Sequence, residues 1–272
     1  GGRVLNPAPF CLIGIVNVTP DSFSDGGKYI DPRNAVAHGL RLLDEGAGML
    51  DLGAESTRPF AEPVPEGEEI ARLMPVVARL RERPDAVLSV DTLKAGTARA
   101  ALEGGADIIN DVSACVADPA LLDVLAEYKP GYVLMHSQGS PREMQVNPRY
   151  GNVVEEILAF FEEHLARLVK AGLPEDRIVL DPGIGFGKNK DHTVAILKGL
   201  ERFASLGRPL YVGLSRKSMF REILGLELEQ RAEATRLAVA LLAARGIPYH
   251  RVHDVAGCAQ ALRLVEAMTP LA

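Results

Sequence analysis

Eight short apolar segments recur along the chain, and stretches with helical periodicity lie between them. The segments are rich in β-branched residues and nearly continuous in apolarity, as is typical of strands in a parallel sheet that is buried on both faces. The predicted strands span residues 11–16, 49–53, 86–90, 107–110, 132–135, 178–181, 210–214 and 249–253. Strict alternation of strand and helix predicts an α/β protein with the fold of a (β/α)8 TIM barrel. An open, doubly wound sheet is the rival interpretation.

The bulk properties of the chain fit one barrel domain. The 272 residues compare with the roughly 250 of a typical barrel, and no linker rich in Ser, Gly or Pro divides them, so we expect a single domain over residues 1–272. The formal net charge of −6 argues against a nucleic-acid partner. No apolar run approaches the roughly 18 residues of a membrane span, so no membrane partner is expected.

The number and spacing of the cysteines indicate the cellular compartment. The three cysteines, Cys11, Cys115 and Cys258, are far apart and form no CxxC pair. A disulfide framework would need more cysteines at closer spacing. We therefore expect a cytoplasmic protein.

Polar or charged residues stand at the carboxyl ends of the predicted strands. In a parallel barrel these ends meet at one mouth, where the active sites of barrel enzymes lie. One such residue alone would be interpreted as a helix cap, but most of these groups are larger or more charged than capping requires. We therefore predict that the mouth is the active site. The residues concerned include Asn17, Glu55, Asp91, Asn110, His136, Asp181, Lys217 and His253.

The mouth residues fall into two chemical groups. The first group consists of hydrogen-bond donors that suit an anion: Arg58, Lys217, Arg251 and His253. Arginine can bind an anion through paired hydrogen bonds. The second group consists of acceptors, or mixed donor–acceptor partners, for a ligand rich in N–H groups: Asp91, Asn110 and Asp181. The ligand that matches both groups has a nitrogen heterocycle at one end and a phosphate at the other.

The loop after the first strand adds hard oxygen ligands. Asn17, Asp21 and Asp25 are of the type that holds Mg²⁺ beside a phosphate. Other motif interpretations fit less well. The stretch GIGFGK at residues 183–188 lacks the spacing and the Ser/Thr of a Walker A loop, and neither a GxSxG elbow nor a Cys–His signature is evident.

Seven motifs, in one order along nearly the whole chain, resemble the dihydropteroate synthase family of pterin-binding enzymes. They read NVTPDSFSDGG, ESTRP, SVDT, IINDVS, DPGIGFGK, SRKS and RVHDV. The resemblance implies a (β/α)8 barrel of folate synthesis that joins para-aminobenzoate to (7,8-dihydropterin-6-yl)methyl diphosphate. It also implies Mg²⁺ as cofactor, a homodimer, and competition by sulfonamides for the aminobenzoate pocket.

The resemblance also implies roles for residues at the matching positions. Asn17 would bind Mg²⁺, and the catalytic residues would be Lys217, Arg251 and His253. Arg251 and His253 would hold the diphosphate, with Arg251 also lying along the pterin face. The pterin would hydrogen-bond Asp91, Asn110 and Asp181, with Lys217 reaching the ring. Thr57 and Arg58 would close over the site, and Pro59, Phe186, Lys217 and Ser218 would shape the aminobenzoate pocket. Met135 and Gly213 complete the implied substrate-binding set.

A departure from the family pattern at Phe60 and two alternative functions bear on this interpretation. Phe60 stands where the family usually has glycine, so the resemblance does not fix the shape of that loop. A pterin-binding methyltransferase of corrinoid metabolism shares the barrel and the acceptors but has no diphosphate to hold, and the basic residues of SRKS and RVH favour the synthase. A catalytically silent homologue that only binds a pterin or a partner protein is the second alternative.

Overall fold

A computed structural model describes residues 9–19, 32–55, 62–139 and 148–268 of the chain. Within these residues, eight parallel strands form one sheet in the order β6-β5-β4-β3-β2-β1-β8-β7. The strands are β1 (Cys11–Asn17), β2 (Met49–Gly53), β3 (Leu88–Asp91), β4 (Ile108–Asp111), β5 (Gly131–Met135), β6 (Ile178–Asp181), β7 (Tyr211–Val212) and β8 (Tyr249–Val252). The predicted strands are all present, with ends that differ by a few residues.

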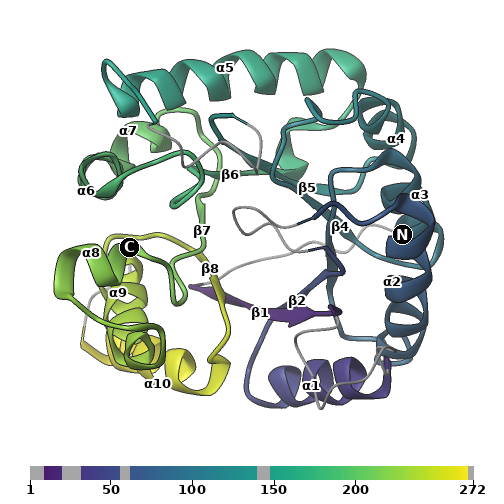
Figure 1. Ribbon diagram of the computed structural model, residues 1–272, viewed down its shortest axis with the longest axis horizontal. Coiled ribbons are helices and arrows are strands. Elements are labelled where there is room, and N and C mark those ends of the chain that lie inside the picture. Colours follow the sequence, from purple (N-terminus) through teal and green to yellow (C-terminus); the bar gives the residue numbers. More distant parts are fainter. Residues whose placement is uncertain (1–8, 20–31, 56–61, 140–147, 269–272) are drawn as a thin grey trace.

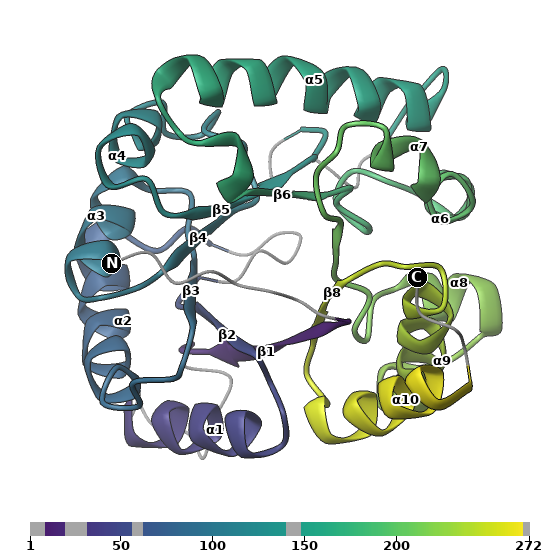
Figure 2. The same cartoon turned by 180° about the vertical axis from the view of Figure 1, so that it is seen from behind.

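Helices surround the sheet in a ring, as Figures 1 and 2 show from opposite sides. They are α1 (Pro32–Asp44), α2 (Glu66–Leu80), α3 (Ala95–Glu103), α4 (Leu121–Tyr128), α5 (Val153–Ala171), α6 (Lys190–Lys198), α7 (Leu200–Ala204), α8 (Met219–Leu224), α9 (Arg231–Ala243) and α10 (Val255–Met268). Two short 3₁₀ helices, η2 (Glu175–Arg177) and η3 (Leu228–Gln230), precede β6 and α9. Among the described residues, none of the helices is long and apolar enough to pass through a bilayer.

The two edge strands, β6 and β7, approach each other through a single bridge. Leu180 pairs in parallel with Leu210, and the Leu180 backbone N–H donates to the Pro209 carbonyl oxygen at 3.0 Å. Pro209 stands just before β7 and has no N–H to give to a ladder, which limits the strand at its amino end. The bridge closes the sheet into a barrel, and the (β/α)8 prediction is confirmed.

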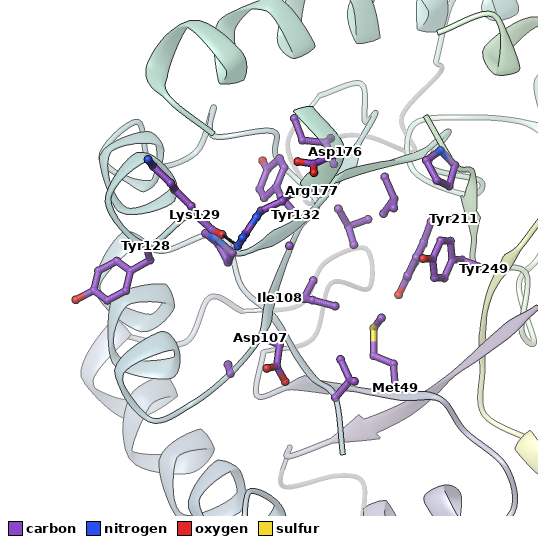
Figure 3. Close-up of a pocket in the computed structure, with 18 of the residues that line it drawn as sticks. Met49, Asp107, Ile108, Tyr128, Lys129, Tyr132, Asp176, Arg177, Tyr211 and Tyr249 are labelled. Carbon is purple, nitrogen blue, oxygen red and sulfur yellow. Dashed lines mark hydrogen bonds between the residues drawn. The ribbon is translucent and has the colours of Figure 1, made fainter. Parts of the chain in front are cut away.

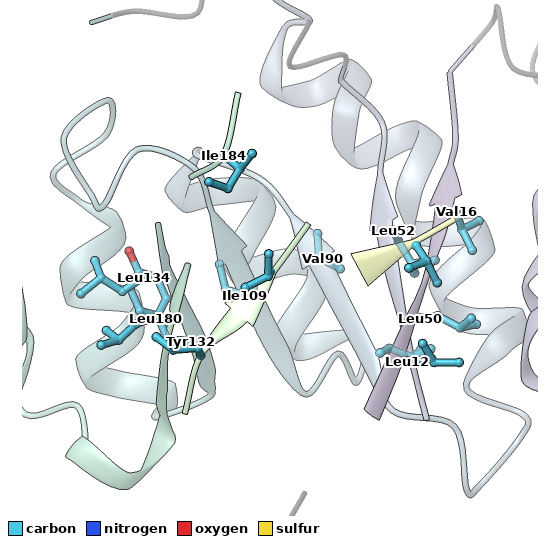
Figure 4. Close-up of a cluster of buried hydrophobic side chains, with 14 of the residues drawn as sticks. Leu12, Val16, Leu50, Leu52, Val90, Ile109, Tyr132, Leu134, Leu180 and Ile184 are labelled. Atoms are coloured by element: carbon cyan, nitrogen blue, oxygen red, sulfur yellow. The ribbon is translucent and has the colours of Figure 1, made fainter. Parts of the chain in front are cut away.

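The outward side chains of the strands pack against the helices. In a strand, successive side chains point to opposite faces, and the outward set is mostly apolar and fully or nearly fully buried. Figure 4 shows this layer, which contains Leu12, Val16, Leu50, Leu52, Val90, Ile109, Tyr132, Leu134 and Leu180. Burial of this apolar surface from water is the main force that holds the helices on the sheet.

The inward side chains change character along the barrel axis. The first inward residues of the strands, near their amino ends, form a second apolar cluster of Cys11, Ile13, Met49, Val87, Ile108, Val133, Tyr211 and Tyr249. The next inward residues, toward the carboxyl ends, are mostly polar or charged. The apolar cluster therefore forms a floor below a polar mouth.

Candidate active site

The polar mouth contains the three predicted acceptors at the ends of β3, β4 and β6. Asp91 accepts a hydrogen bond from Arg251 Nη2 at 3.1 Å. Asp181 Oδ1 accepts from the Gly183 backbone N–H at 2.7 Å. Asn110 Nδ2 donates to Asp51 Oδ2 at 3.0 Å. These three side chains come from one arc of the barrel wall.

Burial disfavours the ionised form of the two acceptor carboxyl groups, Asp91 and Asp181. It raises the pKa of Asp91 to about 7, with the neighbouring Asp51 carboxylate adding to the rise and Arg251 opposing it. Burial also raises the pKa of Asp181, while the Lys217 charge and the Gly183 N–H lower it. A ligand that donates hydrogen bonds or carries positive charge would stabilise both carboxylates.

Arg251, on β8, lies across the barrel against two carboxylates. Its Nε donates to Asp51 Oδ2 at 2.6 Å and its Nη2 donates to Asp91 Oδ2 at 3.1 Å. Burial alone would lower the pKa of Arg251, but the charges of Asp51 and Asp91 raise it above its usual value. The guanidinium is therefore a fixed cation inside the mouth.

Sequence reasoning missed Asp51, because it stands in the middle of β2 between Leu50 and Leu52 and not at a strand end. The alternation of side chains along the strand is the signal that reveals it, because Asp51 lies two residues before Gly53 and so faces inward with it. Its β3 partner in the register, Ser89, donates from Oγ to Asp51 Oδ1 at 2.6 Å.

Lys217 and Phe186 adjoin each other on the loops after β7 and β6. The Lys217 ammonium donates to the Ile184 carbonyl oxygen and lies 4.8 Å from the centroid of the Phe186 ring. Burial lowers the pKa of Lys217 to about 8, although the Asp181 charge counteracts this. The pair presents a cation beside an aromatic face, which suits an aromatic ligand that carries negative charge.

His253 follows β8 and is oriented by Ser215. The Ser215 Oγ atom lies 2.8 Å from His253 Nδ1 and accepts from the His253 backbone N–H at 3.2 Å. Ser215 is buried and His253 is half-buried. Ser215 thus orients His253 through both the backbone N–H and the imidazole ring of that residue.

A buried lysine that the sequence reasoning did not assign joins the loops after β5 and β6. Lys188 Nζ lies 2.9 Å from His136 Nδ1 and donates to the carbonyl oxygens of His136 at 3.2 Å and Phe186 at 2.9 Å. Burial, helped by the Lys188 charge, lowers the pKa of His136 to about 3, so its ring is neutral and can accept. Three acceptors therefore surround the ammonium.

Glycines allow these two loops to touch through their backbones. Gly183 has a φ of +65°, and a Cβ there would lie 1.9 Å from the His136 carbonyl oxygen. Gly187 has a φ of +62°, and a Cβ there would lie 2.5 Å from the Gln138 carbonyl oxygen. The lysine and the two glycines fix the backbone that carries Phe186.

The remaining predicted residues occupy different parts of the mouth. Met135 ends β5, is buried, and pairs in register with Asp181. Gly213 follows β7, where an added Cβ would lie 3.7 Å from Arg251 Cβ and 3.9 Å from Lys217 Nζ. Asn17 ends β1 and is exposed, as is Ser218 at the start of α8. Thr57, Arg58 and Pro59, together with Asp21, Asp25 and Phe60, lie outside the described residues.

A cavity of about 480 Å³ opens at the opposite end of the barrel. Its walls include Tyr211, Tyr249 and Met49 from the apolar floor, and its rim includes Lys129 and Arg177, which precede β5 and β6 (Figure 3). Catalytic residues of barrel enzymes come from the carboxyl ends of the strands. The candidate active site is therefore the polar mouth and not this cavity.

Comparisons with known proteins find relatives over nearly the whole chain. A family model described as "Pterin binding enzyme" matches residues 13–253. Dihydropteroate synthase of Escherichia coli strain K12 is 41% identical over 256 residues, which cover 94% of this chain and 90% of that protein.

Two solved structures also match nearly the whole chain. Dihydropteroate synthase of Yersinia pestis with a sulfonamide drug has a TM-score of 0.92 and 41% identity, covering 98% of this chain and 96% of that one. The Xanthomonas albilineans dihydropteroate synthase in complex with 7,8-dihydropteroate has a TM-score of 0.88 and 42% identity, with coverage of 99% and 98%. The chain thus belongs to the pterin-binding enzyme family, and within it to the dihydropteroate synthases.

Proposed function

We infer that this chain is the dihydropteroate synthase of folate synthesis, which joins para-aminobenzoate to (7,8-dihydropterin-6-yl)methyl diphosphate and gives 7,8-dihydropteroate and pyrophosphate. One observation carries the inference. Carboxylate and amide acceptors for a nitrogen heterocycle and cationic donors for a diphosphate line the same barrel mouth, in a chain that is 41% identical to a curated dihydropteroate synthase.

The chemistry explains why the mouth needs both groups. The C–O bond between the pterin methylene and the diphosphate breaks, a C–N bond forms from the aromatic amine, and the amine gives up one proton. The methylene carbon develops positive charge that the pterin ring delocalises, and the leaving diphosphate gains negative charge. Stabilising that leaving group matters more than a strong base.

Each described residue has a role in this scheme. The pterin N–H groups donate to Asp91, Asn110 and Asp181. The buried carboxylates of Asp91 and Asp181 also favour the developing positive charge. The cations Lys217 and Arg251, with His253 held by Ser215, stabilise the diphosphate. Lys217 also reaches the pterin ring, and the Arg251 side chain lies along it. We assign Lys217, Arg251 and His253 as the catalytic residues.

The aminobenzoate pocket lies between the loops after β6 and β7. Phe186, Lys217 and Ser218 form its described part, and Met135 and Gly213 complete the wall toward the pterin. Thr57, Arg58 and Pro59 are assigned to the same site from the sequence. Sulfonamides, which resemble aminobenzoate in shape and charge, compete for this pocket.

Magnesium is the proposed cofactor, with Asn17 as its protein ligand. The exposed amide at the end of β1 is a hard oxygen donor, and among the described residues no three His, Cys, Asp or Glu side chains are grouped to hold a metal ion. Mg²⁺ is commonly held by one or two protein ligands, substrate phosphates and water, so this donor set fits. When bound, the ion would neutralise charge on the diphosphate.

A homodimer is the proposed assembly, with α9 and α10 as its interface. Each helix exposes two large apolar residues four positions apart, Leu237 and Leu241 on α9 and Leu264 and Met268 on α10, with 60–73% of each residue exposed. Figures 1 and 2 show these two helices side by side on the outside of the barrel. A second copy of the chain would cover such a surface.

Two further assignments complete the proposal. We treat residues 1–272 as one pterin-binding barrel domain. We place the protein in the cytoplasm, because Cys11, Cys115 and Cys258 are all free thiols, as is usual in a reducing compartment.

A steady-state assay with both substrates tests the activity. We expect dihydropteroate and pyrophosphate in equal amounts. Titration calorimetry with pyrophosphate and Mg²⁺ separates this function from that of a corrinoid methyltransferase, which has no diphosphate to hold. Pterin binding without pyrophosphate binding, or without turnover, would contradict the proposed function.

A further inference from the structure

Asp51 is a fully buried carboxylate held by three donors inside the barrel. Its exposed fraction is 0%. Ser89 Oγ donates to Oδ1 at 2.6 Å, while Asn110 Nδ2 and Arg251 Nε donate to Oδ2 at 3.0 and 2.6 Å. A buried carboxylate is stable only when such partners are present. Two of these partners, Asn110 and Arg251, belong to the proposed substrate site, although Asp51 itself has no role assigned there.

The Asp51 carboxylate fixes which end of the Asn110 amide faces the ligand. Asn110 Nδ2 donates to Asp51 Oδ2 at 3.0 Å, so the amide turns its NH₂ group toward the carboxylate. Asn110 stands in register with Asp91, one inward position nearer the mouth than the Asp51–Ser89 pair. The amide oxygen of Asn110 is therefore left on the mouth side, where it extends the row of acceptors.

Asp51 also fixes the guanidinium of Arg251. The Nε and Nη2 atoms lie on one edge of the guanidinium plane, and that edge is bound by Asp51 and Asp91. Arg251 Nη1 donates to none of the residues that the structure describes. The plane is thus held by one edge while its other nitrogen remains for an anion.

We propose that Asp51 is a positioning residue for pterin recognition, which acts through Asn110 and Arg251 without contacting the ligand. This proposal rests on the proposed function of the mouth. With the Asp51 carboxylate in place, the pocket selects a heterocycle that presents N–H donors to Asn110. Without it, the amide can turn over and present its own donors.

Asp111, the residue after Asn110, provides a matched control. It is equally buried, with an exposed fraction of 0%, but its opposite parity points it to the helix layer. There it accepts from the Ser113 and Cys115 backbone N–H groups at 2.7 and 2.6 Å and from the Tyr132 hydroxyl at 2.9 Å. Asp111→Leu therefore perturbs a buried aspartate of the same barrel without touching Asn110 or Arg251.

Calorimetric titration with (7,8-dihydropterin-6-yl)methyl diphosphate compares the wild type, Asp51→Leu and Asp111→Leu. We expect Asp51→Leu, which offers no acceptor to Asn110 or Arg251, to weaken binding by roughly 10- to 100-fold, the range for a misdirected hydrogen bond to a buried polar group. We expect Asp111→Leu to lower the melting temperature but to keep the affinity within about twofold of wild type, a change of under 0.5 kcal/mol on the affinity scale. Equal affinity of Asp51→Leu and the wild type would overturn the proposal.

A conservative variant separates positioning from general support of the fold. Asp51→Asn keeps one oxygen that can accept from both Asn110 and Arg251, while its NH₂ group can donate to the Ser89 hydroxyl. Its binding should stay within about tenfold of wild type. A folded Asp51→Asn protein that has lost pterin diphosphate binding would overturn the proposal, and so decides the case even if Asp51→Leu does not fold. A wild type that fails to bind the pterin diphosphate would instead contradict the proposed function.

Discussion

At the scale of single residues, the inward carboxylates of this barrel differ in what holds them. Asp51 is held by three donors, whereas Asp181 receives one backbone hydrogen bond, from Gly183, and is 6% exposed. The pKa of Asp181 is raised by burial. A bound pterin would supply the donor that its second oxygen lacks among the described residues, and this difference makes Asp181 the more sensitive probe of ligand binding.

Asp181→Asn should weaken pterin diphosphate binding by about 1.5–3 kcal/mol, the usual range for a hydrogen bond to a charged group. The amide oxygen can still accept from Gly183, which turns the NH₂ group toward the N–H donors of the ligand. Titration calorimetry measures the loss, and Asp191→Asn on the exposed start of α6 is the control. Unchanged affinity would show that Asp181 does not contribute to pterin binding.

Lys188 should make stability depend on pH. Its burial lowers its pKa from 10.5 to about 7, opposed by Asp181 and assisted by Lys217. Between these values the unfolded chain binds a proton that the native protein does not, so this residue makes the free energy of unfolding rise as pH rises from about 7 to 10.5.

Lys188→Met should remove that slope. Urea unfolding at several pH values compares it with Lys190→Met, a change at an exposed lysine two residues further along. The stability of the wild type relative to Lys188→Met should rise with pH, because Lys188 then loses its proton and no charge has to be buried on folding. A pH-independent difference between the two proteins would show that Lys188 is charged in both states throughout.

The sequence predicted the mouth residues at strand ends but not their support. Asp91, Asn110 and Asp181 stand next to turn residues, where polar groups are visible as breaks in an apolar run. Asp51 and Lys188 are different, because their partners come from other strands and loops: Ser89 is 38 residues from Asp51 and His136 is 52 residues from Lys188. Such partners follow from strand register and loop contact, which no local pattern contains.

At the scale of elements, the loop after β6 is held at several points by hydrogen bonds to its backbone. Lys188 donates to Phe186 and His136 carbonyl oxygens, and the Tyr150 hydroxyl donates to the Gly187 carbonyl oxygen at 2.9 Å. Strand and helix periodicity cannot reveal such backbone-to-backbone packing. The glycines of GIGFGK let the chain approach the neighbouring loop closely, at Gly183 and at Gly187.

Gly183→Ala should therefore cost more than backbone strain alone. Gly207 has nearly the same φ, +66°, but nothing lies within 4 Å of its added Cβ, so Gly207→Ala should cost only the left-handed strain of about 1–2 kcal/mol. At Gly183 the Cβ would meet the His136 carbonyl oxygen, which should add about 1–3 kcal/mol of overpacking.

Urea unfolding of both glycine variants gives this difference directly. Sulfonamide titration of each variant, loaded with pterin, pyrophosphate and Mg²⁺, reports on Phe186. We expect Gly183→Ala to lose sulfonamide affinity and Gly207→Ala to keep it. Equal stability losses for the two variants would mean that the loops after β5 and β6 separate easily.

At the scale of the whole molecule, the side of the helix ring formed by α9 and α10 exposes large apolar residues in pairs. The paired apolar residues of α9 and α10 are the surface assigned to the dimer. Elsewhere on the ring, Val169 on α5 is 42% exposed and provides a comparison at a distant position (Figure 1).

Leu237→Glu should weaken the dimer by at least about tenfold in dissociation constant, because a charge would be buried at the centre of an apolar contact. Val169→Glu should leave the dimer intact. Sedimentation velocity over a range of concentrations measures both. A wild type that remains monomeric, or a Leu237→Glu variant that associates as the wild type does, would contradict the proposed interface.

The single bridge between Leu180 and Leu210 makes the barrel wall uneven in its resistance to opening. Ladders of two to five register pairs join the other neighbouring strands. Amide hydrogen exchange should therefore be faster at Leu180 than at Leu52, since local opening follows the weakest hydrogen-bonded junction. This junction separates β6, with Asp181, from β7 and the loop that carries Lys217. Local opening at this junction would move Asp181, which is assigned to the heterocycle, away from Lys217, which is assigned to the leaving group. A substrate that contacts both residues would therefore stabilise the closed barrel.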